Sequence, residues 1–104
     1  MLSELNQRVT LEQETLVPDG AGGYLATWNV IASIWASIEP LTGSDVFGPD
    51  ATESRVRYHV TIRRRGDVIA GMRIRKGSRA FLIHAVLDEG AQSQFLNLLT
   101  EETG

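Results

Sequence analysis

The stretch RVRYHVTIRRRGDV, residues 55–68, begins with a strict alternation between two kinds of side chain. Odd-numbered positions from 55 to 63 are Arg, Arg, His, Thr and Arg, and the even-numbered positions between them are Val, Tyr, Val and Ile. Because successive side chains of a β-strand point to opposite faces, this order predicts a strand with one basic face and one apolar face. The chain as a whole is acidic, with a formal net charge of −3, so the partner of the basic face has to be explained.

The same period of two recurs in other segments and predicts a chain built from short strands. Val9 and Leu11 share one face of the first such segment, and polar side chains occupy its other face. A cluster of Pro, Asp and Gly at residues 17–23 then indicates a hairpin turn. The strands predicted in addition to the basic one cover residues 7–16, 24–31, 33–41, 72–75 and 80–90, the last of them ending in an acidic turn.

The segment at residues 92–102 fits either a final strand or a short amphipathic helix. Phe95, Leu98 and Leu99 have the spacing of one helical face, so periodicity alone does not decide between the two. We favour a strand, since the segments before it are predicted to form sheet.

Six or seven short strands separated by turns predict one all-β domain over residues 1–104, built as a small antiparallel barrel or a sandwich. Residues 42–54, TGSDVFGPDATES, interrupt the alternation with two Gly, one Pro and two Asp. This composition predicts a long inserted surface loop, and loops of that length are usually functional or disordered. Helix, if there is any, is confined to this loop or to the tail.

The residues do not indicate catalysis, a cofactor or a metal site. The chain has no cysteine, which excludes a disulfide scaffold and a thiolate zinc site. His59 and His84 belong to no known ligand motif, and GAGG at residues 20–23 lacks the lysine of a phosphate-binding loop. We expect structural roles for both histidines and core positions for Trp28 and Trp35. The prediction is therefore a protein that is not an enzyme and needs no cofactor.

The location of the protein is predicted from two observations. The first residues lack the basic and apolar regions of a signal peptide. The longest apolar-leaning run, residues 30–38, is too short and too rich in serine to cross a bilayer. We therefore expect a cytosolic or particle-bound domain with no membrane partner.

Charge is distributed unevenly along the chain. Residues 1–54 hold one basic and eight acidic side chains, residues 55–79 hold nine and one, and residues 80–104 hold none and four. Such polarity favours contact between the basic face and an acidic partner, including head-to-tail contact between copies. Three roles stay open for the arginines: phosphate contacts to nucleic acid, pairing with acidic strands of the same sheet, or a subunit interface.

Several blocks follow one another in an order that resembles a known family. LNQRVTLEQ is followed by GGYLATWNVIASIWASIEPLTG, RYHVTIRRRGDVIAGMRIR, FLIHAVLDEG and FLNLLTEE. This order is similar to that of the phage head–tail joining family, the small head-closure or stopper proteins of long-tailed phages, prophages and gene transfer agents. The similarity covers nearly the whole chain, and its most specific parts are TW…IWASIEPL, RYHVTIRRR and MRIR. One departure is Ala80, where the family often has a glycine before the aromatic residue, here Phe81.

The resemblance implies a β-barrel subunit of a homo-oligomeric ring at the neck of a virion or virus-like particle, present in the host cytoplasm during assembly. The implied partners are a portal-side adaptor protein, a tail-terminator or tail-tube protein, and the packaged double-stranded DNA in the channel. A long loop would project toward the channel and retain the DNA until ejection, and its place in the block order matches residues 42–54. The residues expected to carry this role are Gly43, Ser44, Asp45, Val46, Phe47, Gly48, Pro49 and Asp50.

We expect the arginines to meet protein rather than DNA. DNA has to pass through a connector channel, and a wall that neutralised 6–10 phosphates would bind it with an affinity that changes roughly 10³–10⁵-fold over moderate salt. We therefore predict that the basic face meets acidic surface on a neighbouring subunit or an adjoining ring. A small basic-faced barrel that binds nucleic acid is the alternative. The predicted interface residues are Arg55, Arg57, Arg63, Arg64, Arg65, Arg73 and Arg75.

Overall fold

The computed structural model describes residues 5–41, 56–88, 90 and 93–103. These residues form six strands and no helix. The strands are β1 (Gln7–Pro18), β2 (Tyr24–Pro40), β3 (Arg57–Arg63), β4 (Arg73–Lys76), β5 (Arg79–Leu87) and β6 (Phe95–Glu102).

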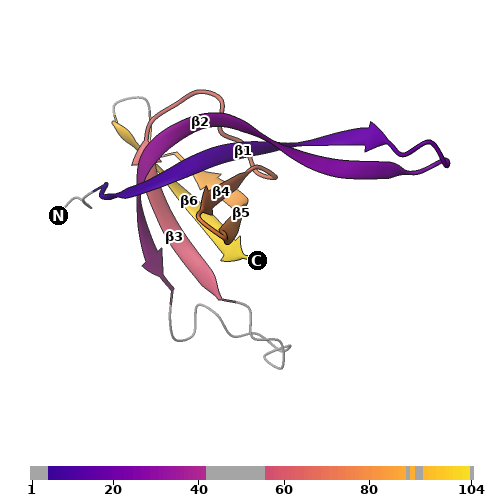
Figure 1. The fold of residues 1–104 in the computed structure, drawn as a ribbon. Helices are drawn as coiled ribbons and strands as arrows, with labels where there is room; N and C mark the ends of the chain where they lie inside the picture. Colours follow the sequence, from indigo (N-terminus) through magenta and orange to yellow (C-terminus); the bar gives the residue numbers. More distant parts are fainter. Residues whose placement is uncertain (1–4, 42–55, 89, 91–92, 104) are drawn as a thin grey trace, which may run out of the picture.

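All six strands belong to one antiparallel sheet that closes into a barrel in the order β1-β2-β3-β6-β5-β4 (Figure 1). Although β6 comes last in the sequence, it lies between β3 and β5. The barrel is closed where β1 meets β4, and this seam consists of three residue pairs centred on Leu11 and Ile74. The predicted fold class, a small antiparallel β-barrel of six strands, is confirmed.

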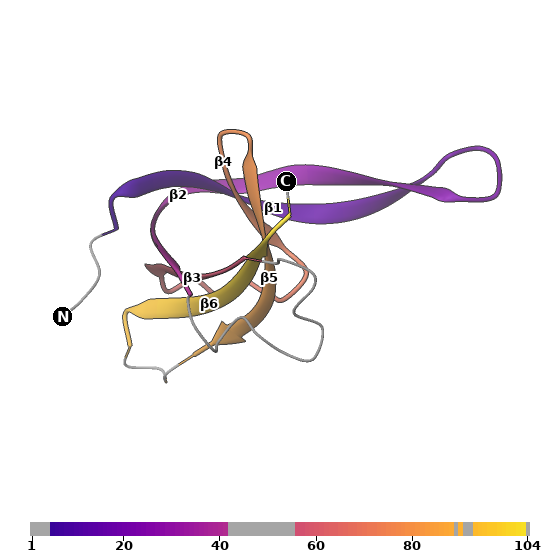
Figure 2. The same ribbon diagram turned by 90° about the horizontal axis from the view of Figure 1, so that it is seen from below.

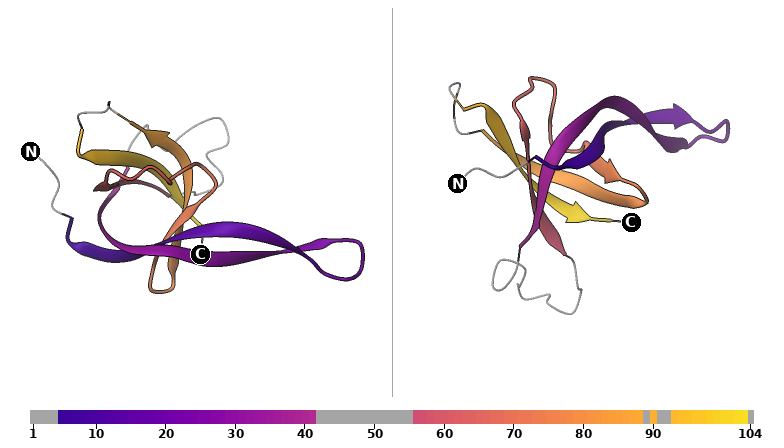
Figure 3. Two further views of the ribbon diagram at one scale, coloured as in Figure 1. Left: turned by 90° about the horizontal axis from the view of Figure 1, so that it is seen from above. Right: turned by 60° about the vertical axis from the view of Figure 1, so that its left-hand side comes forward.

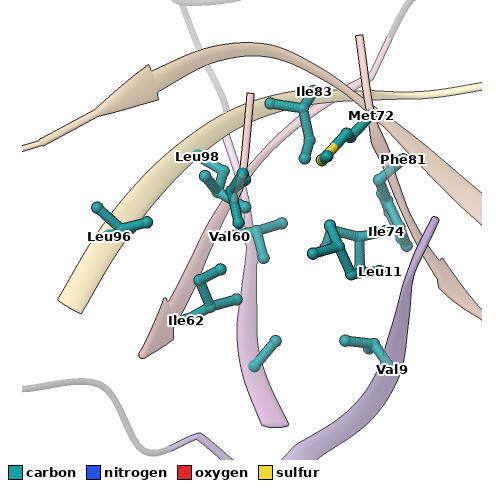
Figure 4. Close-up of a cluster of buried hydrophobic side chains, with 12 residues drawn as sticks. Val9, Leu11, Val60, Ile62, Met72, Ile74, Phe81, Ile83, Leu96 and Leu98 are labelled. Atoms are coloured by element: carbon teal, nitrogen blue, oxygen red, sulfur yellow. The ribbon is translucent and has the colours of Figure 1, made fainter. Parts of the chain in front are cut away.

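The barrel interior is filled by the apolar positions of the alternating segments. Val60 and Ile62 of β3 are fully buried, as is Leu11 of β1, and their side chains point toward one another between the strands (Figure 4). Phe81 of β5 is also fully buried and packs edge-on against the ring of Tyr58, with ring centres 5.0 Å apart and planes at 79°. The apolar face of the basic strand is therefore one wall of the core.

The two strands expected after the hairpin turn are one continuous strand, β2. Leu11 pairs with Ala32 whereas Glu12 pairs with Val30, so Ile31 has no partner on β1. Such a bulge inserts one residue, bends the strand and leaves the alternation intact on either side. The break in alternation that suggested two strands is thus a bulge and not a turn.

Beyond the barrel, β1 and β2 continue as a two-stranded arm, residues 13–30, that projects to one side (Figures 1 and 2). Its turn is held by the Asp19 carboxylate, which accepts hydrogen bonds from the backbone N–H groups of Ala21 (2.8 Å) and Gly23 (3.0 Å). These hydrogen bonds hold the pKa of Asp19 below its ordinary value. Gly22 has a φ of 88°, a conformation that glycine adopts without strain. The predicted hairpin turn is confirmed.

The tail forms strand β6, as favoured, and not a helix. Leu98 points into the core and is fully buried, while Phe95 and Leu99 are half-buried on the outer surface. The predicted long loop, residues 42–54, lies outside the described residues. Figure 3 shows that the arm extends well past the barrel in both views.

Candidate assembly surface

The basic face predicted for β3 lies on the outside of the barrel. Arg57 and Arg63 are exposed there, whereas the apolar positions between them point into the core. Thr61 lies on the same outer face but is only 6% exposed, and its hydroxyl donates a hydrogen bond of 3.2 Å to Asn97 Oδ1 of β6. The outer face of β3 therefore presents two cations separated by a polar, closely packed patch.

A row of outer-surface residues continues from Arg57 around the barrel. In the register of the sheet, Arg57 lies opposite Glu101 of β6, and Glu101 lies opposite Leu82 of β5. Leu82 lies opposite Arg73 of β4, and Arg73 lies opposite Glu12 of β1. Both carboxylates are only 6% exposed, although they lie on the outer surface. Opposite charges in facing positions stabilise a sheet, so part of the basic charge is balanced within the chain.

Arg73 is enclosed at the seam between β1 and β4. Its Nε lies 2.5 Å from Glu12 Oε1, and its guanidinium carbon lies 4.2 Å from the ring centre of Trp28. The side chains of Arg73 and Glu12 are 16% and 8% exposed. Because both side chains are largely shielded from water, either charge without the other would strongly destabilise the fold. Arg73 therefore fastens the seam.

Arg64 connects the end of β3 to the segment that follows β5. It donates hydrogen bonds to both carboxylate oxygens of Asp88 and to the carbonyl oxygens of Gly90 and Ser93, the last at 2.6 Å. The hydrogen bonds from Arg64, together with the N–H of Gly90, lower the pKa of Asp88 to about 2. Arg64 thus has a structural role in holding this turn.

Arg65 and Arg75 make local contacts. Arg65 binds the Asp67 carboxylate through two hydrogen bonds of 2.8 and 3.0 Å, which lower the pKa of Asp67. Arg75 is exposed, and its Nε donates a hydrogen bond of 3.0 Å to the carbonyl oxygen of Gly77.

The structure thus divides the predicted interface arginines into two groups. Arg64, Arg65 and Arg73 are bound to carboxylates of their own chain. Arg57, Arg63 and Arg75 have no ion pair within the described residues. The Arg63 guanidinium lies 6.0 Å from the ring centre of Phe95. Arg55 and the predicted channel residues 43–50 lie outside the described part of the chain.

A cluster at one end of the barrel was not anticipated from the sequence. Arg79 makes two hydrogen bonds to the Glu102 carboxylate, at 2.8 and 3.1 Å, and one of 3.1 Å to the Tyr58 hydroxyl. Its guanidinium also lies 5.0 Å from the ring centre of Phe81. The hydrogen bonds from Arg79 hold the pKa of Glu102 below its ordinary value. The alternation of apolar and polar residues predicts that Tyr58 and Phe81 face inward. It does not connect Arg79 with Glu102, which lies 23 positions later in the sequence.

His84 is the extra residue of a bulge in β5, since the pairing with β6 steps from Ile83 to Ala85. Its Nε2 lies 2.7 Å from Oε1 of Glu101, a carboxylate 17 positions away in the sequence. The bulge directs the imidazole toward this buried acid. The contact agrees with the structural role expected for this histidine.

Trp35 lies on the outer surface and is 49% exposed, so the expected core position is wrong for this residue. Its neighbour Ala36 takes the inward position, and the Arg8 guanidinium lies 5.0 Å from the Trp35 ring centre. Trp28 is half-buried beneath Arg73 on the outer side of the arm's base. A shallow pocket of about 250 Å³ lies beside Trp35. Its lining residues are Ile34, Trp35, Arg63, Arg64 and Arg65.

Among the described residues, no three His, Asp or Glu side chains are grouped so that they could hold a metal ion. That part of the chain also contains no helix capable of crossing a membrane. What the described surface offers is charged, aromatic and apolar side chains suited to contact with other macromolecules.

A closed barrel with a filled core, a charged outer wall and a protruding arm defines a small all-β domain with an extended hairpin. The model of the phage head completion protein family matches residues 2–103, and the chain belongs to this family. Membership supports a structural role in completing the head, in agreement with the resemblance found in the sequence. No curated protein sequence gave a match.

Two solved structures share the fold. A chain of the native gene transfer agent virion superposes with a TM-score of 0.76 and 27% sequence identity, over 98% of each chain. Protein SF1141 from Shigella flexneri 2a, known from a solution structure, gives a TM-score of 0.72 and 24% identity, over 96% of this chain and 94% of that one. The second likeness shows the fold alone, whereas the first comes from an assembled particle.

The Glu12–Arg73 pair predicts a large effect on stability. Glu12→Ala should lower the free energy of unfolding by about 3 kcal/mol, because it leaves an enclosed guanidinium without its carboxylate. Glu14→Ala, at an exposed position of the same strand, is the matched control and should change it by less than about 0.5 kcal/mol. Urea unfolding measures both, and equal effects would show that the seam does not depend on this pair.

The lowered pKa of Asp88 predicts a pH dependence. Its carboxylate has an ordinary pKa of 3.8 and a folded pKa of about 2, so its stabilising contribution is complete above pH 3.8 and is lost as pH falls toward 2. The melting temperature of Asp88→Asn should therefore lie below that of the unaltered chain at pH 5, and the two should converge near pH 2. Thermal melts across this range test the effect, and a constant difference would contradict it.

Proposed function

We propose that this chain is a head–tail connector subunit, a head-closure or stopper protein of a phage, prophage or gene transfer agent. In this role it occupies the neck of the particle, between a portal-side adaptor protein and a tail-terminator or tail-tube protein. The observation that carries the proposal is the likeness, over 98% of each chain, to a component of a gene transfer agent virion. Before assembly the subunit resides in the host cytoplasm.

Assembly into a homo-oligomeric ring is part of the proposal. Arg57 and Arg63 are exposed cations on the outer wall, and the exposed acids of the same chain include Glu14 and Glu39. Identical subunits that present different, complementary patches form heterologous contacts, and such contacts close into a ring when the rotation between copies allows it. Charge complementarity of this kind fixes the orientation of the subunits more than it adds affinity.

Retention of DNA is assigned in this proposal to residues 42–54. They join β2 to β3 at the end of the barrel where Pro40 pairs with Tyr58. The Arg79–Glu102 hydrogen bonds and the contact of Arg79 with Tyr58 fasten three strands at that end. A firmly held base would let one such segment from each subunit act together in the channel, with Val46 and Phe47 supplying apolar contacts between copies.

The exposed arginines give the first test of the proposal. Arg57→Glu combined with Arg63→Glu should abolish tailed particles, because both charges that face acidic partner surface are reversed. Lys76→Glu is the control, because Lys76 lies on β4, across the barrel from β3 and away from the candidate interface, and tailed particles should persist. Electron microscopy counts tailed and tailless particles, and circular dichroism verifies that each variant folds. Normal numbers of tailed particles with the double variant would refute this placement of the interface.

Binding of nucleic acid by a free, basic-faced barrel is the alternative function. It is favoured by the location of Arg63 beside the ring of Phe95, since cations next to aromatic rings are typical of single-strand-binding surfaces. The connector proposal predicts no appreciable shift of DNA in a gel at physiological salt. The alternative predicts binding by the monomer that weakens steeply between low and high salt. A gel-shift titration at two salt concentrations, with single- and double-stranded DNA, separates them.

A further inference from the structure

The arm, residues 13–30, exposes apolar side chains that nothing in the described chain covers. On its outer face Leu16 is 60% exposed and Tyr24 67% exposed, and the register places them on the same face, with Leu16 opposite Ala26 and Tyr24 opposite Pro18. On the opposite face Val17 is 43% and Leu25 59% exposed. Contiguous exposed apolar side chains of this kind mark an interaction surface.

The arm also lacks the features that protect an unpartnered hairpin. Beyond the seam with β4 the arm strands pair, among the described residues, only with each other, so both edges of the arm present backbone groups that no described strand pairs with. The arm contains no Lys or Arg, and charged residues, lysine above all, are the usual protection of such edges. A two-stranded hairpin without a further layer is only marginally stable in water. The arm is therefore built to be covered by another surface.

The pocket beside Trp35 is basic and partly apolar, and it therefore complements the arm. Its wall combines the exposed face of Trp35 with the apolar side chain of Ile34. It also carries Arg63, a cation with no ion pair in the part of the chain that the structure describes. Arg8 adds a second cation over the Trp35 ring, 5.0 Å from its centre. The charged residues of the arm are acidic only: Glu14 and Asp19. An apolar, acidic arm thus fits an apolar, basic pocket.

The arm cannot reach the pocket of its own chain. Tyr24, at the start of β2, and Ile34, at the pocket, are ten positions apart on one extended strand. At the rise of a strand this corresponds to roughly 30 Å. The arm also projects away from the barrel in every view (Figures 1 to 3). Only another molecule can bring the two surfaces together.

We propose that the outer face of the arm, centred on Leu16 and Tyr24, packs into the pocket lined by Ile34, Trp35 and Arg63 of a second copy of this chain. The contact is heterologous, since arm and pocket are different surfaces, and it leaves the pocket of one copy and the arm of the other free to extend the assembly. It deepens the proposed function, on which it rests, by naming the contact that would build the ring.

The absence of cysteine makes this contact testable by cross-linking. Each copy is given Leu16→Cys on the outer face of the arm and Arg65→Cys at the pocket. Purified particles carrying the variant are treated with a short bis-maleimide and separated on a denaturing gel. The expected result is a ladder of dimers, trimers and higher species, because every copy links to the next.

Three control variants define the contact. Thr27→Cys with Arg65→Cys places the arm thiol on the opposite face, since Thr27 lies one pair further from the tip than Leu16. Leu16→Cys alone and Arg65→Cys alone provide only one of the two surfaces. All three should remain monomeric on the gel. A dimer from Leu16→Cys alone would mean arm-to-arm packing and would overturn the proposal.

The outcomes distinguish this contact from the proposed function. Tailed particles that contain the chain but give no ladder, or that link Leu16→Cys to a different particle protein, overturn the contact and leave the connector function standing. Absence of the chain from tailed particles overturns the connector function. In that case the same variants, cross-linked as concentrated purified protein, decide the contact alone: a ladder supports it and monomers reject it.

Discussion

The barrel depends on a seam of three residue pairs between β1 and β4. Each of the other neighbouring strand pairs is joined by more residue pairs than this seam. The barrel is therefore held by the fewest backbone hydrogen bonds where β1 meets β4. Fully buried Leu11 and Ile74 fill the inner side of the seam, and the Glu12–Arg73 pair, with Arg73 stacked over Trp28, fastens its outer side. A closed barrel has no edge strands, and this short seam is what removes them from the body of the protein.

Ion pairs like the one at the seam also account for several of the arginines of this acidic protein. Arg73 and Arg79 are each fastened to a carboxylate from a distant part of the chain, and Arg64 holds the turn after β5. Among the described residues, the exposed arginines are Arg8, Arg57, Arg63 and Arg75, of which Arg57 and Arg63 lie together on β3. Internal pairing thus commits Arg64, Arg65, Arg73 and Arg79 to the fold, while the exposed arginines stay at the surface.

Much of this fold could be predicted from alternation and turn residues. The alternation around Val60 identified a wall of the core, and the Asp- and Gly-rich segment at residues 17–23 identified the hairpin turn, because both depend on local geometry. What alternation could not predict was the order of the strands or the pairing of Glu12 with Arg73, since both depend on contacts between residues far apart in the sequence. Alternation predicts two strands where β2 is one, because the one-residue insertion at Ile31 looks the same as a break in the pattern.

The place of β6 affects how the protein can form. This strand is made after all the others and yet lies between β3 and β5, where Leu98 closes the core. Until it has been synthesised, β3 and β5 each have an edge with no neighbour, and the earlier strands cannot surround a complete interior. Folding therefore waits for the end of translation of this domain and proceeds through contacts of long sequence separation, which are slow to form. A chain that folds in this way presents its complete outer surface only once β6 is in place between β3 and β5.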